Sequence, residues 1–317
     1  MLHERRFRAM NTDIAVWLWN LDPQAGMILG QVEELFTAIE AEMSRFRPDS
    51  GLSRLNGRAG QGPQPVSAEL LTVISLALAA ARSSGGVFDP TVLTALMDAG
   101  YDRSFDQLAA GGSHGPTDVV SARPDWRRVV VDAAGHTISL PAGLGLDLGG
   151  IAKGWAVDQA AALLSGWGEG LIDAGGDMRS TGAPGGVPWP IGVQDPFHPD
   201  RTLTVFNLGT GAIATSSIGG RRWQRGGQEL HHLIDPRTGR PSASDLHTVT
   251  VRAGSTVQAE TAAKVALILG SAAGRRYLES RGLSALLIRR DGAQIPVGEL
   301  GELAVAWSVE PLHAALT

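Results

Sequence analysis

The sequence predicts an α+β fold in which mixed sheets and helices form two packed lobes. Strand-like and helix-like segments are interspersed along the 317 residues without a regular βαβ repeat. We find no linker and no internal repeat, so we expect a single domain over residues 1–317. The chain has 41 glycines, often paired beside polar residues, which indicates loops shaped around a ligand.

Hydrophobic spacing and turn residues place each expected element. Apolar positions at helical spacing predict helices over 27–43, 67–83, 151–164 and 256–270. Alternating or apolar runs predict strands over 12–19, 146–148, 170–173, 189–194, 202–208, 212–215, 247–252 and 283–289. A hairpin is expected over 127–140, with its turn at Ala134-Gly135. Residues 102–124 are polar and rich in glycine, which indicates an irregular surface insertion.

Composition excludes several classes of protein. The net charge of −5 and the absence of long basic runs argue against nucleic-acid binding. Without cysteine there are no disulfides, thiolate metal sites, cysteine nucleophile or lipid-bearing cysteine. The longest apolar run, residues 70–81, is too short to cross a bilayer, and the N-terminal residues do not resemble a signal peptide. We therefore expect a cytoplasmic protein without membrane insertion.

Residues 146–158, LDLGGIAKGWAVD, are the most informative segment. An apolar strand end leads into Gly149 and Gly150, where the absence of a Cβ permits a sharp turn and a close approach to a ligand. A helix follows, and its N-terminus presents backbone N–H groups and a positive dipole end. Lys153 adds a full positive charge there. The segment predicts a site for a phosphate-bearing ligand, with an ordinary strand-to-helix turn as the alternative.

Two glycine motifs are weak. Residues 111–115, GGSHG, match the G-x-S-x-G pattern of serine hydrolases, but they lie in an unperiodic loop and lack the required strand and helix. We interpret that match as chance. Gly143 and Gly145 could open a dinucleotide fingerprint, but Leu148 stands where the third glycine is required.

Two charged or titratable pairs leave alternatives open. His231 and His232 lack a third partner at metal-ligand spacing, so one of them is a candidate general base, a phosphate contact or a hydrogen-bonded turn residue. The Asp235-Pro236 turn is expected to orient His232. Glu260 and Lys264 share one face of an otherwise apolar helix, where they form either an ion pair or part of a polar cavity.

Taken in order, a series of segments resembles one family. They are MNTDIAVWL, EAEMSRFRPDSGLSRLN, the G-x-F-D-P-T block at 86–91, LDLGGIAKGWAVD, the A-G-G-D turn at 174–177, Thr215-Ser216, and the H-x-I-D-P-x-T-G block at 232–239. With the closing helix, they cover about residues 9 to 270. The chain is identified on this resemblance as a member of the flavin transferase family, the ApbE-type FAD:protein FMN transferases.

The resemblance implies an ApbE-like fold and an activity. Relatives of this type hold FAD in a cleft between the lobes, cleave its pyrophosphate, and transfer FMN to a Thr or Ser hydroxyl of an acceptor protein with Mg²⁺. It implies that Met10 and Ile234 lie beside the flavin, Phe46 over the adenine, Val87, Phe88 and Asp89 along the nucleotide, and Gly149 and Lys153 at the phosphates. It also implies His232 as the catalytic or phosphate-contacting imidazole and the Ala152 carbonyl as a metal ligand.

The closing helix departs from the family pattern. Relatives have A-D-A-x-x-T, whose Asp and Thr bind Mg²⁺, whereas this chain has Glu260 and Lys264 at those positions. Mg²⁺ requires oxygen ligands in near-octahedral geometry, and an ammonium repels it. Either Lys264 points away, or its ammonium takes the place of the metal beside the phosphates. Glu260 as a metal ligand is therefore doubtful, and we expect poor Mg²⁺ binding and slow or absent FMN transfer. Ser217 also replaces the glycine of the usual T-S-G block.

Three functions remain open on the sequence alone. The first is an active FAD:protein FMN transferase in which His232 or Glu260 takes the proton of the acceptor hydroxyl. The second is an FAD-binding protein of the same fold with little or no transferase activity, and the third is an FAD pyrophosphatase. The sequence does not specify the acceptor protein, the oligomeric state or whether FAD remains bound on purification.

Overall fold

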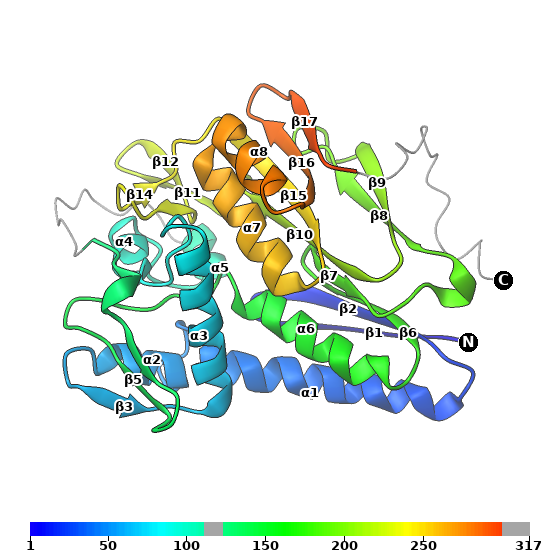
Figure 1. Ribbon diagram of the computed structural model, residues 1–317, viewed down its shortest axis with the longest axis horizontal. Helices are drawn as coiled ribbons and strands as arrows, with labels where there is room; N and C mark the ends of the chain where they lie inside the picture. Colours follow the sequence, from blue (N-terminus) through cyan, green and yellow to red (C-terminus); the bar gives the residue numbers. More distant parts are fainter. Residues whose placement is uncertain (111–122, 300–317) are drawn as a thin grey trace.

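A computed structural model describes residues 1–110 and 123–299 (Figure 1). Within these residues the central element is an eight-stranded sheet in which every neighbouring pair is antiparallel. Its strands, in spatial order, are β1 Leu2–Ala9, β2 Thr12–Trp19, β6 Glu169–Ala174, β7 Asp177–Ser180, β10 Gly211–Ser217, β15 Leu246–Ala253, β16 Ser284–Arg289 and β17 Gln294–Val297. This sheet is the scaffold of the larger lobe.

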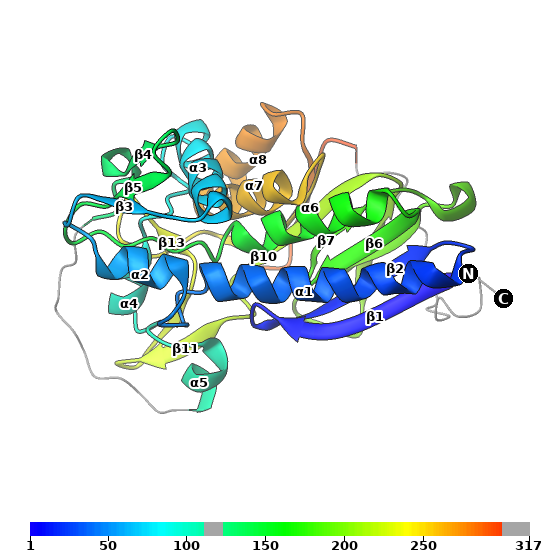
Figure 2. The ribbon, with the colours of Figure 1, turned by 90° about the horizontal axis from the view of Figure 1, so that it is seen from below.

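Helices cover one face of the sheet and a hairpin covers part of the other. The helices are α1 Gly26–Met43, α6 Ala152–Ser165, α7 Thr256–Leu269 and α8 Ser271–Glu279. Figure 2 shows α1 and α6 running side by side beneath the sheet. The hairpin of β8 Trp189–Gln194 and β9 Thr202–Leu208 buries Phe206 and Ile191 against the opposite face. Apolar side chains therefore fill both interfaces of a layered structure.

The smaller lobe lies at the left of Figure 1 and combines short helices with short strands. Its helices are α2 Gly51–Gly57, α3 Ala68–Ser83, α4 Leu93–Asp98 and α5 Phe105–Ala110. Its strands are β3 Pro63–Pro65, β4 Val130–Asp132, β5 Thr137–Ser139, β11 Arg222–Arg225, β12 Gln228–His231, β13 Ile234–Asp235 and β14 Arg240–Pro241. The α+β class with two packed lobes is confirmed. Among the described residues, no helix is both long and apolar enough to cross a membrane.

Most of the expected elements are present. The strand at 12–19, the helices at 27–43, 67–83, 151–164 and 256–270, and the hairpin with its turn at Ala134-Gly135 match β2, α1, α3, α6, α7 and β4–β5. Strands 170–173, 189–194, 202–208, 212–215, 247–252 and 283–289 match β6, β8, β9, β10, β15 and β16. The insertion predicted at 102–124 contains α5, and the 111–115 motif lies outside the described residues.

The predicted strand at 146–148 is wrong. Leu146 and Leu148 are buried, but this segment forms no strand. Leu146 pairs with a side chain: Asn56 Nδ2 donates to the Leu146 carbonyl over 2.9 Å, and its Oδ1 accepts from the Leu146 amide over 2.8 Å. On either side the contacts are to residues 90–92, because the Asp147 amide donates to the Pro90 carbonyl over 2.8 Å and Gly145 forms an isolated parallel bridge with Val92. An amide side chain from α2 therefore interrupts the backbone pairing that would make this segment a strand, and periodicity does not reveal that partner.

Candidate active-site cleft

A cleft lies between the two lobes and has two adjoining hollows. The Met10 hollow is lined by Met10, Asn11, Glu40, Met43, Ser44, Arg45, Phe46, Tyr101, Asp147, Leu148, Gly149, Ala152, Lys153 and Arg221. The His232 hollow is lined by Arg45, Phe46, Val87, Phe88, Asp89, Val92, Leu96, Tyr101, Asp147, Gly149, Gly150, Arg221, His232, Leu233, Ile234, Pro236, Lys264 and Ile268. The residues common to both hollows make them one continuous site.

The glycine turn forms the wall shared by these hollows. The Gly149 amide donates to Asp147 Oδ1 over 3.0 Å, and helix α6 begins two residues beyond Gly150 without a side-chain cap. Its first turn carries Lys153 into the Met10 hollow. The amide of Gly154 donates to Glu260 Oε2 over 2.9 Å. One donor of the helix N-terminus is thus already bound to a carboxylate of the protein itself.

Lys153 belongs to a buried charge cluster. Its ammonium forms an ion pair with Asp177, whose side chain is only 3% exposed. Burial alone would lower the pKa of Lys153, but the carboxylates of Asp177 and Glu260 outweigh burial and raise it. Burial, followed by the charge of Asp177, raises the pKa of Glu260 to about 7. Lys153 is therefore a firmly charged cation, whereas Glu260 exchanges its proton near neutral pH.

Lys264 is turned into the His232 hollow. Its Nζ lies 5.8 Å from the centre of the Phe88 ring and packs so closely on Gly150 that a Cβ there would overlap it. No hydrogen bond or ion pair within residues 1–110 and 123–299 engages this ammonium. Burial lowers the pKa of Lys264, while Glu260 and Asp147 oppose that change. Of the two orientations that the sequence left open, the structure has the inward one.

The two histidines have different environments. His231 Nε2 lies 3.0 Å from the Ser242 carbonyl oxygen, and its Nδ1 accepts from the Leu233 amide over 3.3 Å, so His231 holds its own loop. His232 lines the cleft and has a buried Nδ1 without a partner among the described residues. Burial, with the charges of Arg221 and Lys264, lowers its pKa well below the ordinary value. A neutral imidazole at pH 7 is able to accept a proton.

The expected role of Asp235 in orienting His232 is wrong. Both carboxylate oxygens of Asp235 accept from the Arg237 guanidinium, over 2.8 Å each, and Oδ1 also accepts from the Arg237 amide over 3.0 Å. This carboxylate therefore stabilises the turn after β13. It is therefore not available to orient the His232 ring.

Arg45 is a cleft residue that the sequence did not single out. Its guanidinium carbon lies 4.1 Å from the centre of the Phe46 ring and 4.5 Å from that of Tyr101, and its Nε is 2.7 Å from Asp147 Oδ2. Its Nη2 is buried and has no partner within the described part of the chain. A buried cationic donor without an acceptor is costly, so a ligand oxygen at this point would satisfy it.

The structure brings almost all predicted site residues to this cleft. Those that line it are Met10, Phe46, Val87, Phe88, Asp89, Gly149, Ala152, Lys153, His232 and Ile234. Glu260 lies behind the wall, on Gly154. Asp89 has its carboxylate turned to the protein, where it accepts from the Thr91 amide and hydroxyl and from the Trp126 amide. Arg45, Tyr101, Arg221 and Asp177 were missed, although Arg45 and Asp177 lie inside the family-like blocks.

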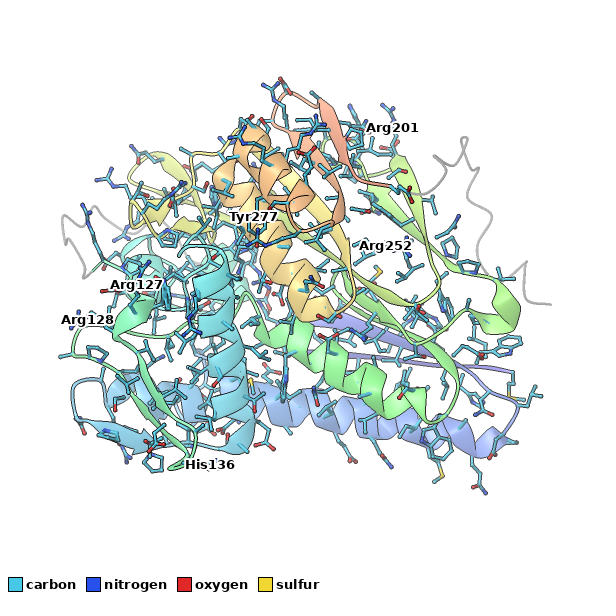
Figure 3. All side chains as sticks on the ribbon, in the orientation of Figure 1. Arg127, Arg128, His136, Arg201, Arg252 and Tyr277 are labelled. Atoms are coloured by element: carbon cyan, nitrogen blue, oxygen red, sulfur yellow. The ribbon has the colours of Figure 1, made fainter. Side chains whose placement is uncertain are left out.

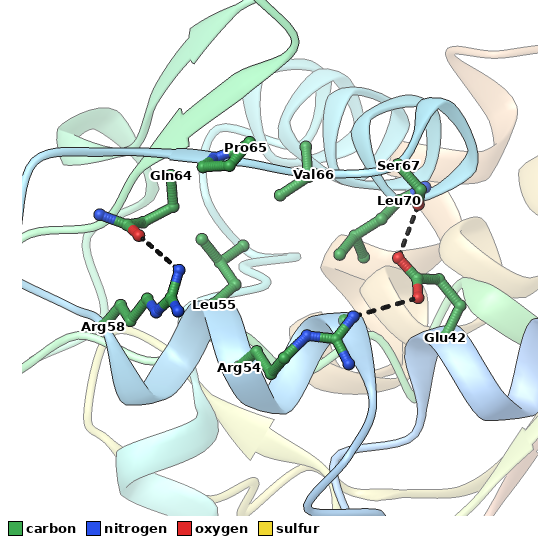
Figure 4. A pocket seen from close by; sticks show the side chains of 10 residues that line it. Glu42, Arg54, Leu55, Arg58, Gln64, Pro65, Val66, Ser67 and Leu70 are labelled. Carbon is green, nitrogen blue, oxygen red and sulfur yellow. Dashed lines mark hydrogen bonds and ion pairs between the residues drawn. The ribbon is translucent and has the colours of Figure 1, made fainter.

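A separate pocket lies between α2 and α3, and it contains neither the predicted site residues nor the unpartnered cationic groups of the cleft (Figure 4). Its charged groups are paired with each other: Ser67 Oγ donates to Glu42 over 2.6 Å, Arg54 lies 4.0 Å from the same carboxylate, and Arg58 donates to Gln64 over 3.2 Å. No predicted site residue lines it. The cleft between the lobes is therefore a stronger candidate for the functional site than this pocket.

The layered sheet, the helix cover and the cation-lined cleft define an α+β protein with a candidate ligand site between two lobes. The ApbE family model matches residues 10–287, so the chain belongs to the ApbE family and the resemblance is confirmed. The FAD:protein FMN transferase of Treponema pallidum is 31% identical over 291 residues, covering 84% of this chain and 79% of that protein. The protein of the same name from Vibrio cholerae is 31% identical over 271 residues, covering 81% of this chain and 78% of that one.

Solved structures of similar proteins have the same architecture. The crystal structure of the ApbE protein from Thermotoga maritima has a TM-score of 0.85 at 26% identity, and the match covers 94% of this chain and 97% of that one. The flavin transferase ApbE from Vibrio cholerae has a TM-score of 0.77 at 26% identity, with the same coverage. The ApbE-like fold predicted from the resemblance is thus confirmed.

Proposed function

We propose that this chain is an FAD:protein FMN transferase acting as a single domain, with FAD as substrate and a Thr or Ser hydroxyl of an acceptor protein as the attacking group. The observation that carries the proposal is the set of unsatisfied cationic donors in the cleft. Lys264 Nζ and Arg45 Nη2 both lack partners among the described residues and face a wall built from the glycine turn. A pyrophosphate supplies the oxygens that these donors need.

We infer the following reaction. The acceptor oxygen attacks the phosphorus of the FMN half, the bond from that phosphorus to the bridging oxygen breaks, and AMP leaves with the bridging oxygen. His232, neutral at pH 7, takes the proton of the attacking hydroxyl. Lys153 and Lys264 stabilise the charge that develops on the phosphates. Among the apolar lining residues, Met10 and Ile234 would contact the flavin, and Phe46 the adenine.

Magnesium does not fit the donor set of this cleft. The Glu260 oxygen Oε2 already accepts from the Gly154 amide, and two lysine side chains flank the same carboxylate. In the described part of the chain, no group of three or more histidines and carboxylates is arranged to hold a metal ion. We therefore infer that cations of the protein itself balance the charge of the phosphates.

The test measures FMN and AMP released from FAD by the purified protein, with water as the acceptor. Covalent transfer is followed by flavin fluorescence of protein bands after denaturing electrophoresis, when a bacterial extract is added. The expected result is equal amounts of FMN and AMP, and fluorescent bands that are absent with His232→Gln. FAD that binds but releases no AMP in either assay would refute the transferase and favour an FAD-binding protein.

A further inference from the structure

We propose that Lys264 is a built-in cation that replaces a divalent metal in this protein, so that the cleft binds the pyrophosphate of FAD without Mg²⁺. This inference rests on the proposed function, because it names the group that neutralises the substrate of that reaction. The inference goes beyond that function because it states that FAD binding by this chain does not require a divalent metal ion. The inference is based on the position of the Lys264 ammonium and on the residues that surround it.

The chain contains only two lysines, Lys153 and Lys264, among its 27 basic Lys and Arg residues, and both line the cleft. Arginine supplies the other cations: Arg45 and Arg221 line the same cleft, and Arg127, Arg128 and Arg201, for example, project from the exposed surface (Figure 3). A lysine ammonium is a compact point charge, whereas a guanidinium is a broad planar fork. The cleft thus holds both lysines of the chain beside two arginines, and each lysine places a small, concentrated positive charge there.

The two lysines differ in their partners within the protein. Lys153 is bound to Asp177 and compensates a buried carboxylate of the protein. Lys264 has no such partner within the described residues, although Glu260 precedes it by one helical turn on α7. The Glu260 carboxylate is directed instead to the Gly154 amide of α6. The charge of Lys264 thus remains available to a ligand, and FAD brings a pyrophosphate to this cleft.

The backbone makes room for this ammonium. A Cβ at Gly150 would overlap Lys264 Nζ, so the second glycine of the turn leaves the space that Nζ occupies. Helix α7 is also fixed relative to α6, because Asp158 Oδ1 accepts from the Thr256 amide over 2.8 Å and Oδ2 from the Val257 amide over 3.1 Å. The position of Lys264 against the glycine turn is therefore set by two helices that are joined where the N-terminus of α7 meets the middle of α6.

A second cation would meet strong repulsion here. Lys153 and Lys264 both act on the same carboxylate, Glu260, and a divalent ion placed between them would face two positive charges in a partly desolvated cleft. An ammonium neutralises phosphate charge and donates hydrogen bonds, but it does not polarise a phosphoryl oxygen as strongly as Mg²⁺ does. FMN transfer is thus expected to be slow and insensitive to magnesium.

The experiment titrates FAD into the purified protein by calorimetry, once with EDTA and once with excess Mg²⁺. The unaltered protein is expected to bind FAD equally well in both buffers. Lys264→Met removes the charge but keeps an apolar chain, and should weaken FAD about 10- to 100-fold in EDTA, the size of a charge-assisted contact. Gly150→Ala keeps both lysines but displaces the ammonium, and should weaken FAD in the same direction.

Gly166→Ala is the matched control, because Gly166 ends the same helix α6 and a Cβ there meets no atom within 4 Å. It should bind FAD as the unaltered protein does. The double variant Glu260→Asp with Lys264→Thr restores the family's ligand pair, and its FAD binding should become dependent on Mg²⁺. Thermal unfolding checks that each variant is folded.

A second experiment measures the reactivity of the two lysine side chains, which are the only lysines in the chain. Trace acetylation in EDTA, followed by peptide mass spectrometry, reports each lysine separately, and FAD should protect Lys264 from the reagent. FAD binding by the unaltered protein that is lost in EDTA and restored by Mg²⁺ would overturn the proposal, as would binding without metal that Lys264→Met leaves unchanged. In both cases the transferase function stands. Failure to bind FAD in either buffer would overturn the proposed function together with this inference.

Discussion

Removing Lys153 should reduce the stability of the protein as well as its affinity for FAD. The Lys153 ammonium is the ion-pair partner of Asp177, and the side chains are 17% and 3% exposed. In Lys153→Met, the Asp177 carboxylate would stay buried on β7 without its cation, with Glu260 as a nearby second carboxylate. The substitution therefore leaves an uncompensated buried charge. The free-energy cost of that charge is much larger than the net stabilisation that the intact ion pair provides.

The expected magnitude follows from this burial. Breaking a buried ion pair by removing one partner costs about 3–5 kcal/mol, whereas replacing both partners by neutral groups is close to neutral. We therefore expect Lys153→Met to lower the free energy of unfolding by about 3–5 kcal/mol at pH 7. The double variant Lys153→Met with Asp177→Asn should recover most of that loss.

The assay is urea unfolding of the single and double variants at pH 7, followed by circular dichroism, with FAD binding measured by calorimetry on the folded proteins. FAD affinity should fall by about 1–3 kcal/mol in both variants, because the phosphate contact is lost in each. A single variant as stable as the unaltered protein, or a double variant no more stable than the single one, would refute the assignment of Lys153 to a buried charge pair. Unchanged FAD affinity would refute its place at the phosphates.

Three further predictions test other parts of the site and its support. His232→Gln should lower turnover about 10²- to 10⁴-fold at saturating FAD, and a loss confined to FAD affinity would show that His232 is only a ligand contact. The folded protein holds a proton on Glu260 up to a pKa of about 7, above the ordinary value of 4.5, so stability should fall as pH rises between these values. In Glu260→Gln this fall, of about 1–3 kcal/mol, should be absent from pH-dependent urea unfolding. Asn56→Ala should cost about 2–4 kcal/mol in the same assay, because the amide and carbonyl of Leu146 lose their partner; a loss below 0.5 kcal/mol would contradict the role given to Asn56.

The class of fold, the family and the location of the glycine turn that lines the cleft were all predictable from the sequence alone. These features depend on local rules: apolar spacing that distinguishes a helix from a strand, and glycines where the backbone must turn. The boundaries of β2, α1 and α3 match the prediction closely because such signals lie within each segment. The order of the family-like blocks can likewise be recognised without knowing which residues are in contact.

Pairings between distant residues were decided only by the tertiary structure. Asn56 replaces a strand partner for Leu146, and Asp235 turns to Arg237, so two local interpretations were wrong. Neither outcome is visible in a sequence, because a short polar side chain can satisfy any backbone group that folding brings near it.

The direction of Lys264 is the main feature that required the structure. In the sequence, Glu260 and Lys264 are an ordinary pair one helical turn apart. The packing of α7 on α6 directs Glu260 to the Gly154 amide and leaves Lys264 against Gly150, where its charge faces the cleft. Helical spacing says which side chains share a face, but only the neighbouring helix decides what that face meets.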